Sequence, residues 1–388
     1  MNPADFKADS PGRLIAIPEG GMAFVPAPIP IDLPLSSEIT QLAEEAGHAL
    51  GLLEGVTRSL PNSKLLVRPL LRREAELSSR IEGTYASQKE LLLFEINPTE
   101  AKNPDVKEVQ NYVDALEYGL KRLRDLPVCL RLISELHAQL MRGVRGGDRR
   151  AGEFRRVQNW IGRHGRSITE ARFVPPPPAE LAACLDAFEK VLHAESPLPF
   201  LVRLALSHYQ FEAIHPFEDG NGRIGRLLLL LLLCERGILS QPVLQLSAHF
   251  ERNRAEYYDH LLDISQSGAW ESWITFFLRG VAQEAKEATA RSEKLLNLRQ
   301  EYRDQLQGPR ASAHALKLVD SLFMTPAVTI SGAAQILKVT FPSAQATVQK
   351  LVDAGILHEI TGKPRNRVYL APRILSIVTH GQASAKPE

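Results

Sequence analysis

The sequence is poor in cysteine, carries almost no net charge and lacks a long hydrophobic run. Its three cysteines, Cys129, Cys184 and Cys234, show no C-x-x-C spacing, which disfavours a disulfide framework or a zinc site and favours a reducing compartment. The net charge of +1 gives no indication of a nucleic-acid or membrane surface on the molecule as a whole. The longest apolar stretch has about eight residues, whereas a helix that crosses a bilayer needs about 20.

We expect no signal peptide, because no basic segment precedes an apolar one in the first residues of the sequence. We therefore expect a cytoplasmic protein without a membrane partner. The chain has 388 residues, of which 44% are hydrophobic and 23% charged, and this is the usual composition of a globular protein with two or three domains.

Helical periodicity dominates the chain from Leu35 to about residue 305, with apolar residues recurring at i, i+3 and i+4. Residues 1–35 are rich in Pro and Gly and are expected to form an extended arm. The block Arg163–Pro178 breaks the helical pattern, and its Phe173-Val174 pair predicts a short β-hairpin, or flap. The expected helices are residues 37–59, 67–82, 85–95, 105–124, 127–142, 178–193, 198–213, 222–236, 254–265 and 269–305.

The composition changes near Gln307, and the residues beyond it predict a small additional domain. Its expected elements are helices at 311–324, 330–337 and 340–354 and strands at 356–360 and 367–370. Thr340 can cap the third helix and Gly355 can end it. Three helices followed by a β-ribbon predict a winged helix-turn-helix. We expect a mainly α-helical chain with domains at residues 1–100, 101–305 and 306–388.

Most of the chemistry lies in one stretch, His215–Arg226, which is His-Pro-Phe-Glu-Asp-Gly-Asn-Gly-Arg-Ile-Gly-Arg. It runs directly into Leu227–Leu233, which predicts a buried helix. A glycine-rich turn that leads into a helix binds anions, because the first N–H groups of the helix are unsatisfied and the helix dipole is positive there. Arginines can extend such a site along a chain of phosphates, and an acid can hold the metal that phosphates carry. The stretch therefore predicts a triphosphate-binding turn with a histidine base beside it.

This stretch resembles the signature of the Fic family, H-x-F-x-[D/E]-G-N-G-R-x-x-R, and matches it at every specified position. The resemblance extends over roughly residues 5–300, and the residues after them resemble the winged-helix tail of some bacterial members. It implies a Fic helical bundle with a short β-hairpin flap. It also implies the transfer of AMP from ATP to a Ser, Thr or Tyr hydroxyl of a target protein, with release of pyrophosphate.

The resemblance also assigns roles within the stretch. His215 would be the general base, and Asp219 would bind Mg²⁺ between the α- and β-phosphates, with the adjacent Glu218 as an alternative ligand. The phosphates of ATP would be bound by Gly220, Asn221, Gly222, Arg223 and Arg226. Related toxins that transfer phosphate replace the glycine at the position of Gly222, so its presence here favours AMP transfer.

A second, weaker signal lies upstream, where residues 78–83 match the [S/T]-x-x-x-E-[G/N] element of the family's inhibitory helix. Gly83 is expected to end a helix, so the carboxylate of Glu82 would oppose the helix dipole and need a cation. The resemblance names Arg226 as that cation, with Glu82 in the place of the ATP γ-phosphate and Ser78 orienting the helix end. An exposed Glu82 without a partner is the alternative. Some family members use this residue to remove AMP, so the reverse reaction also stays open.

Two further regions are assigned by resemblance alone. Ile161, Gly162 and Phe173 would belong to the flap, which holds the target segment by β-augmentation; a plain surface hairpin is the alternative. Tyr257 and Tyr258 resemble the segment that lines the family's adenine pocket, although aromatic pairs at this spacing also pack in cores.

The last part of the chain is basic, since residues 311–388 hold eight Lys or Arg against four Asp or Glu. The presumed recognition helix, Pro342–Ala354, offers few polar side chains for reading bases, so protein docking or dimerisation competes with DNA binding there. The expected partners are a target protein and ATP, with a homodimer and DNA also considered. A Fic enzyme with another donor, and a nucleotide-sensing DNA-binding regulator, remain alternative functions.

Overall fold

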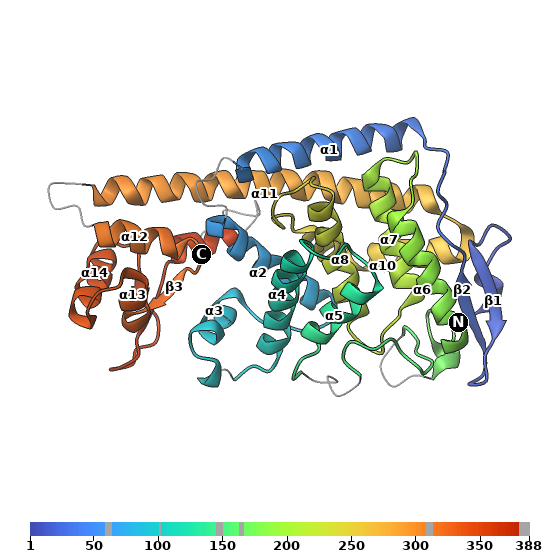
Figure 1. Ribbon diagram of the computed structural model, residues 1–388, viewed down its shortest axis with the longest axis horizontal. Coiled ribbons are helices and arrows are strands. Elements are labelled where there is room, and N and C mark those ends of the chain that lie inside the picture. Colours follow the sequence, from blue (N-terminus) through green and yellow to red (C-terminus); the bar gives the residue numbers. More distant parts are fainter. Residues whose placement is uncertain (59–63, 101, 145–149, 163–166, 308–312, 380–388) are drawn as a thin grey trace.

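The computed structural model describes residues 1–58, 64–100, 102–144, 150–162, 167–307 and 313–379, and the fold is mainly α-helical (Figure 1). The helices up to residue 306 are α1 (Ser37–Arg58), α2 (Lys64–Ile81), α3 (Gln88–Ile96), α4 (Asp105–Arg122), α5 (Leu130–Leu140), α6 (Pro178–His193), α7 (Phe200–Ile214), α8 (Asn221–Glu235), α9 (Leu246–Arg252), α10 (Arg254–Ser267) and α11 (Trp270–Leu306). Each helix predicted from periodicity is confirmed. The short α9 was not predicted.

The ends of the helices follow local capping chemistry. α3 begins at Gln88 rather than at residue 85, because Ser87 caps it and forms a reciprocal capping box with Glu90. α2 ends at Ile81, and Gly83 follows with a left-handed φ of +85°, as expected for a glycine that stops a helix.

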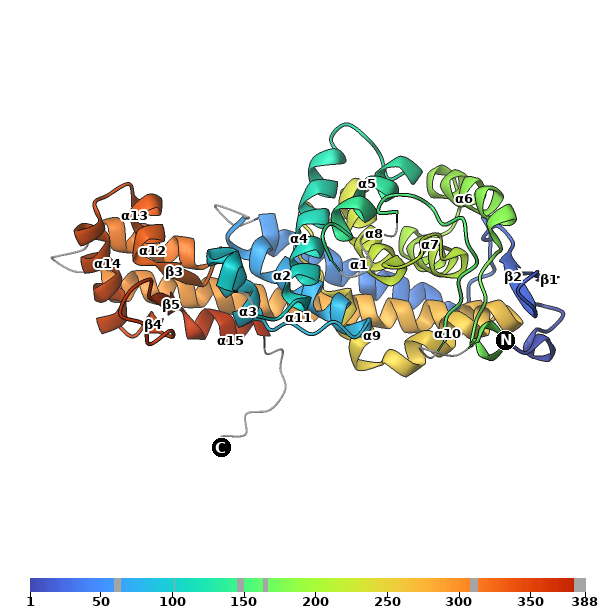
Figure 2. The same ribbon diagram turned by 90° about the horizontal axis from the view of Figure 1, so that it is seen from below.

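The stretch His215–Arg226, which contains the candidate site, begins directly after α7 and runs into the first turns of α8. Leu227–Leu233 of α8 is buried on all sides, so the prediction of a buried helix is confirmed. The 37-residue α11 lies along α1 and extends beyond it to the C-terminal part of the molecule (Figures 1 and 2). At 1.5 Å per residue such a helix is on the order of 55 Å long, so it connects the two ends of the molecule.

The N-terminal arm differs from the expectation. It forms an antiparallel hairpin of β1 (Gly12–Ala16) and β2 (Met22–Pro26) instead of a single extended segment. Gly20 and Gly21 adopt positive φ angles in the turn, which glycine does at little cost. Phe24 of β2 is buried, and its N–H donates to the carbonyl of Val174, so the hairpin holds the chain segment before α6.

The predicted flap contains less β-structure than expected in its described residues. Ile161 and Phe173 form an isolated antiparallel bridge, and a 3₁₀ turn, η3 (Ile168–Glu170), lies between them. Residues 163–166 of the predicted hairpin lie outside the described residues.

The C-terminal part, residues 313–379, is called the tail below. Its elements are α12 (Ala313–Leu322), β3 (Ala327–Thr329), α13 (Ile330–Leu337), α14 (Phe341–Asp353), β4 (His358–Glu359), β5 (Val368–Leu370) and α15 (Pro372–Thr379). The strands form an antiparallel sheet in the order β3-β5-β4. Three helices and a two-stranded ribbon were predicted and are present, whereas β3 and α15 were not predicted. The assignment as a winged helix and the three domain boundaries stay predictions.

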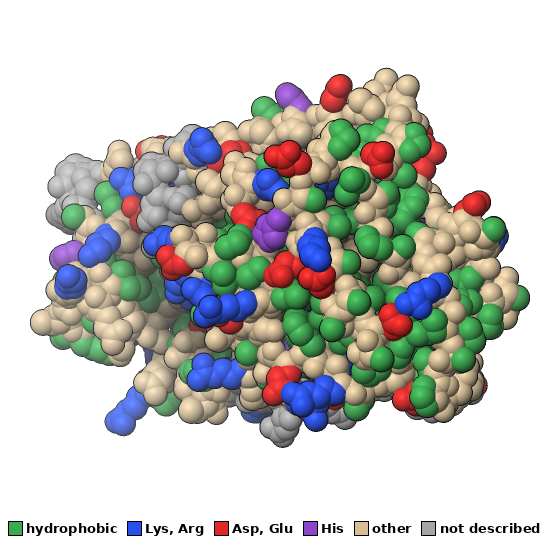
Figure 3. All heavy atoms as spheres, turned by 45° about the vertical axis from the view of Figure 1, so that its right-hand side comes forward, with side chains coloured by type: hydrophobic (Ala, Val, Ile, Leu, Met, Phe, Trp, Pro, Cys, Tyr) green, Lys and Arg blue, Asp and Glu red, His purple; other side chains and the backbone are tan. Residues whose placement is uncertain are grey.

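The tail has its own hydrophobic core, to which the end of α11 contributes Leu295, Leu298 and Tyr302. It also contacts the rest of the molecule through a smaller cluster in which Leu92 of α3 packs against Ala327 and Leu370 of the sheet. On the face drawn in Figure 3, cationic and anionic side chains are interspersed. Within the described ranges, no helix combines the length and the apolar character that crossing a membrane requires.

Candidate active site

His215 directly follows the last residue of α7, Ile214, and caps the helix. Its backbone is left-handed, with φ +49° and ψ 62°, which is uncommon for a residue other than glycine. The side chain is half-buried, and Nδ1 lies 3.3 Å from the carbonyl oxygen of Glu212. Because a carbonyl can only accept, Nδ1 carries the proton and Nε2 is left with a free lone pair.

The surroundings of His215 keep its imidazole neutral. Burial lowers the pKa of His215 to about 4, and the positive charge of Arg155 acts in the same direction. Only the neutral imidazole can accept a proton. The residue is therefore in the form that a general base requires at neutral pH.

The loop after His215 is closed by a side-chain clasp. The backbone N–H of Phe217 donates to Asn221 Oδ1 at 2.8 Å, and Asn221 Nδ2 donates to the Phe217 carbonyl at 2.8 Å. Asn159 Nδ2 donates to the same carbonyl at 2.9 Å. Phe217 is fully buried and stacks on His137 with a centroid distance of 3.8 Å. Asn221 thus acts through its side chain in shaping the loop.

Arg155 fixes the start of this loop, although no sequence pattern marks it as a site residue. It is buried and donates from Nε to the His215 carbonyl at 2.9 Å and from Nη2 to the Ile214 carbonyl at 3.3 Å. Burial lowers the pKa of Arg155 to about 10, so the guanidinium stays charged at neutral pH. These contacts join residues about 60 positions apart, and no local pattern marks them.

His137 of α5 holds the other side of the loop and was also missed. Its Nδ1 accepts from the Gly152 N–H at 2.9 Å, so Nε2 carries the proton and donates to the Asp219 carbonyl at 3.0 Å. A histidine on the apolar face of a helix is indistinguishable by sequence from an ordinary core residue.

The first turn of α8 has the backbone geometry that the glycines predict. Gly220 is left-handed, with φ +79°, and no described side chain caps this end of the helix. The first N–H groups of the helix are therefore directed at the loop without intrahelical partners. A Cβ at Gly222 would overlap Glu82 Oε1 and would lie 2.9 Å from Arg226 Nη1. The carboxylate of Glu82 thus lies directly over this turn.

Arg226 and Glu82 form the predicted ion pair. Arg226 is 1% exposed, and its Nη2 donates to Glu82 Oε1 at 2.6 Å. Its Nε donates to Ser78 Oγ and its Nη2 to the Ser78 carbonyl, both at 2.9 Å. Desolvation opposes ionisation of Glu82, but Arg226 outweighs it and lowers the pKa of the carboxyl. Arg226 Nη1 has no hydrogen-bond partner within the described part of the chain.

Arg223 is also buried and paired with a carboxylate of the chain. Its Nη1 donates to Glu108 Oε2 at 3.1 Å, and its Nη2 lies 3.7 Å from Asp219 Oδ1. Its Nε lacks a partner among the described residues. Both arginines of the motif thus keep a nitrogen that an added anion could satisfy.

Asp219 is the carboxylate best placed to bind a metal. Its side chain is 51% exposed, and Oδ1 accepts from the Gly220 N–H at 2.6 Å. Among the described residues no group of three or more His, Cys, Asp or Glu could hold a metal ion. One carboxylate fits Mg²⁺ here, because this ion commonly binds one or two carboxylates together with substrate phosphates and water. The half-buried Glu218 beside it remains the alternative.

The two tyrosines assigned to adenine lie in different surroundings. Tyr257 is buried in an aromatic cluster, stacks on Phe250 at 4.5 Å, and has its hydroxyl 2.7 Å from His208 Nε2. Tyr258 is half-buried beside it, with a ring distance of 5.2 Å. The adenine assignment of both stays a prediction.

The flap residues are joined by the bridge described above. The Ile161 N–H donates to the Phe173 carbonyl at 2.8 Å, and the Phe173 N–H donates back at 3.1 Å. Phe173 is buried against Phe24 of the N-terminal hairpin, whereas the neighbouring Trp160 is exposed. Gly162 allows close approach, since a Cβ there would lie 3.3 Å from the Cα of Ala171. Target docking at this bridge stays a prediction.

Comparison with known proteins agrees with these features. The family model described as Fic/DOC family N-terminal matches residues 40–121, and the model of the Fic/DOC family matches residues 127–233. The chain is 35% identical over 156 residues to the protein adenylyltransferase Fic of Drosophila grimshawi, and 35% identical over 151 residues to that of Culex quinquefasciatus. These segments cover 40% and 38% of this chain but 29% and 27% of the two relatives.

Solved structures share the fold. A Fic family protein from Desulfovibrio desulfuricans superposes with a TM-score of 0.56 at 18% identity, covering 87% of this chain and 97% of that one. A Fic domain containing signaling protein from Bacteroides thetaiotaomicron gives a TM-score of 0.50 at 21% identity, covering 66% and 96%. At these identities the likeness concerns the fold alone. A Fic/DOC family N-terminal segment and a Fic/DOC family domain are therefore recognised within this chain, at residues 40–121 and 127–233, and the chain shares the fold of solved Fic proteins.

Proposed function

We propose that this protein transfers AMP from ATP to a Ser, Thr or Tyr hydroxyl of a target protein, and that Glu82 holds it inactive. One observation supports the proposal above all: the Glu82 carboxylate lies over Gly222 and accepts a hydrogen bond of 2.6 Å from Arg226. A carboxylate of the chain thus lies where a helix N-terminus and an arginine would bind a phosphate. The adenylyltransferase names of relatives at 35% identity support the same chemistry.

In this proposal His215 is the general base. Its Nδ1–H donates to the Glu212 carbonyl, which leaves Nε2 to take the proton of the target hydroxyl. The hydroxyl oxygen then forms a bond to the α-phosphorus of ATP. The bond from that phosphorus to the oxygen bridging to the β-phosphate breaks, and pyrophosphate leaves.

The phosphates would bind to the first turn of α8. Arg223 and Arg226 would reach the β- and γ-phosphates once Glu108 and Glu82 release them. Asp219 would hold Mg²⁺, which when bound would neutralise part of the phosphate charge. The loop contacts of Arg155 and Asn221 would keep His215 in place while the phosphates exchange for the carboxylates.

Inhibition follows because Arg226 Nη2 cannot donate the same hydrogen bond to the Glu82 carboxylate and to the γ-phosphate at once. With Glu82 in place, the γ-phosphate would lose this donor and would meet a like charge over Gly222. ATP could still bind through the other contacts, but its phosphates would be displaced from the position in which His215 acts.

We also propose a cytoplasmic location, with which the free thiols of the three cysteines agree.

The kind of transfer is tested with ATP labelled at either the α- or the γ-phosphate, incubated with Mg²⁺, the protein and cell lysate. We expect protein labelling from the α-phosphate and none from the γ-phosphate. Label from the γ-phosphate would mean phosphate transfer and would overturn the proposal. His215→Ala should lower labelling about a hundredfold or more. His193→Ala, which removes an exposed histidine of α6, is the matched control and should label like the parent protein.

A further inference from the structure

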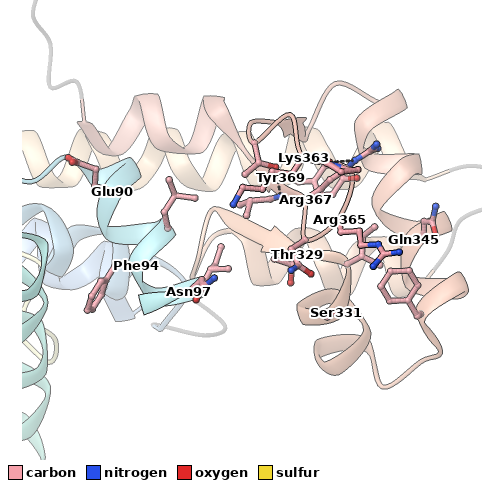
Figure 4. A pocket seen from close by; sticks show the side chains of 18 of the residues that line it. Glu90, Phe94, Asn97, Thr329, Ser331, Gln345, Lys363, Arg365, Arg367 and Tyr369 are labelled. Atoms are coloured by element: carbon pink, nitrogen blue, oxygen red, sulfur yellow. Dashed lines mark hydrogen bonds between the residues drawn. The ribbon is translucent and has the colours of Figure 1, made fainter. Parts of the chain in front are cut away.

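A groove of about 970 Å³ lies between α3 and the tail (Figure 4). Figure 1 shows α3 and the tail at a distance from α7, the helix that His215 follows. One wall comes from α3 and the segment after it, with Phe94, Asn97 and Lys102. The other wall comes from the tail: the starts of α13 and α14 and the turn between β4 and β5. In Figure 4, Phe94 and Asn97 lie on one side, and Arg365 and Gln345 on the other. The proposed transfer reaction does not use this groove.

The lining of the groove is cationic. It contains four cationic side chains, Lys102, Lys363, Arg365 and Arg367, against one carboxylate, Glu90. The Glu90 carboxylate already accepts hydrogen bonds from the Ser87 N–H at 2.8 Å and from Asn103 Nδ2 at 3.1 Å. Lys102 and Arg365 have no ion-pair partner among the described residues. The groove therefore favours an anionic ligand.

The same lining also offers apolar and amide groups. Leu93, Ile96 and Val106 contribute aliphatic surface, and Gln345 and Gln349 of α14 add amide donors and acceptors. Phe341, at the start of α14, is 51% exposed. Side chains of this mixture can bury apolar groups, pair with amides and attract negative charge at one site.

The size and lining together select the class of ligand. The volume of the groove lies within the range of small-molecule sites, about 300–1,000 Å³. A groove of this size is too small to enclose a nucleic-acid duplex. Single strands bind mainly by stacking bases on exposed aromatic rings, and Phe341 is the one exposed large aromatic among the described lining residues. We propose that this groove binds a short, extended, acidic peptide segment of a protein partner. Its carboxylates pair with the cationic side chains of the turn between β4 and β5, and its apolar side chains pack between α3 and α14.

Binding is tested on the full-length protein without ATP, so that the result does not depend on AMP transfer. The probe is a fluorescent peptide that alternates aspartate with leucine, and its anisotropy is measured as protein is added. The counterpart with asparagine in place of aspartate, a single-stranded oligonucleotide and a duplex are measured in parallel. We expect the acidic peptide to bind more tightly than the other three probes and to weaken as salt rises.

Arg365→Glu should weaken the acidic peptide about tenfold, since it replaces an attraction by a repulsion in the groove. Lys317→Glu is the matched control, because it reverses an exposed charge of α12 outside the groove, and it should bind like the parent protein. Thermal unfolding of both variants shows that they are folded. Three outcomes would overturn the proposal: no binding of the acidic peptide, equal binding by Arg365→Glu and the parent, or tighter binding of either oligonucleotide.

Discussion

Two arginine–glutamate pairs involve α2 or the residue after it, and they differ in how many guanidinium nitrogens of the arginine have a hydrogen-bond partner. Arg72 of α2 is 1% exposed and uses all three nitrogens: Nε and Nη2 donate to Glu95 at 2.7 and 2.6 Å, and Nη1 donates to the Met324 carbonyl at 3.0 Å. Arg226 is also 1% exposed, but its Nη1 has no described partner. The side chain of Glu95 is 13% exposed and that of Glu82 is 32% exposed.

The difference separates a structural contact from an exchangeable one. A buried charge whose hydrogen bonds are all made is costly to disturb, so the pair of Arg72 and Glu95 fastens α2, α3 and the tail together. A pair with a free nitrogen and a partly exposed carboxylate can exchange the carboxylate for another anion. On this interpretation α2 is fixed near its middle by Arg72 and is followed at its C-terminal end by a releasable residue, Glu82.

The largest effect is expected from breaking the fastened pair. Arg72→Ala leaves the buried side of Glu95 and the Met324 carbonyl without their donor, and should lower the free energy of unfolding by about 3–5 kcal/mol. Chemical denaturation measures it. Arg279→Ala, which breaks an exposed pair with Glu38, is the control and should cost about 0–1 kcal/mol. Equal losses in the two variants would remove the distinction between the contacts.

The releasable pair predicts a response to nucleotide. Glu82→Gly vacates the place over Gly222, so ATP with Mg²⁺ should raise the unfolding temperature of this variant several degrees more than that of the parent protein. Glu82→Gln, which keeps the shape but removes the charge, should give an intermediate shift. If ATP stabilised the parent and both variants equally, Glu82 would not compete with phosphate for Arg226.

The pH dependence sharpens the role of the neutral histidine. Because the pKa of His215 is lowered to about 4, the base is already deprotonated at mildly acidic pH. The labelling rate of Glu82→Gly should therefore stay nearly level from about pH 8 to about pH 6 and fall only as pH approaches the lowered pKa. A rate that halves near pH 6.5, the ordinary histidine pKa, would contradict the assigned environment.

The smallest effect is expected from weakening the pair of Arg72 and Glu95 and measuring how often Glu82 leaves Arg226. Glu95→Gln keeps the shape of the side chain but weakens the bond to Arg72, which should loosen α2 and let Glu82 leave Arg226 more often. We expect labelling from ATP to rise about twofold, with the free energy of unfolding lowered by about 1 kcal/mol. Reduced labelling in a folded variant would argue against coupling along α2.

The parts that the sequence predicts well are those that depend on local patterns. Periodicity placed the helices, and the left-handed Gly83 ended α2 where a glycine stop was expected. The pairing of Glu82 with Arg226 was expected from the family resemblance and is present. The hairpin of β1 and β2 was missed because a segment rich in Pro and Gly predicts an arm rather than strands.

Other parts depend on contacts between distant segments and could not be predicted. Arg155 and His137 shape the loop of the site by bonding to backbone carbonyls about 60 and 82 positions away, and such contacts leave no spacing pattern. Arg72 reaches the Met324 carbonyl 252 positions away. The groove between α3 and the tail likewise forms only when residues 90–106 and 329–369 come together.

We propose that Glu82 blocks a working site by occupying the place of a phosphate. The initial rate of protein labelling from ATP labelled at the α-phosphate, compared between Glu82→Gly and the parent protein in the same lysate, tests it most directly. We predict a rate about tenfold to a hundredfold higher in the variant, because a charged hydrogen bond contributes about 1.5–3 kcal/mol, and loss of that labelling when His215→Ala is added. Equal rates in the variant and the parent would contradict the account.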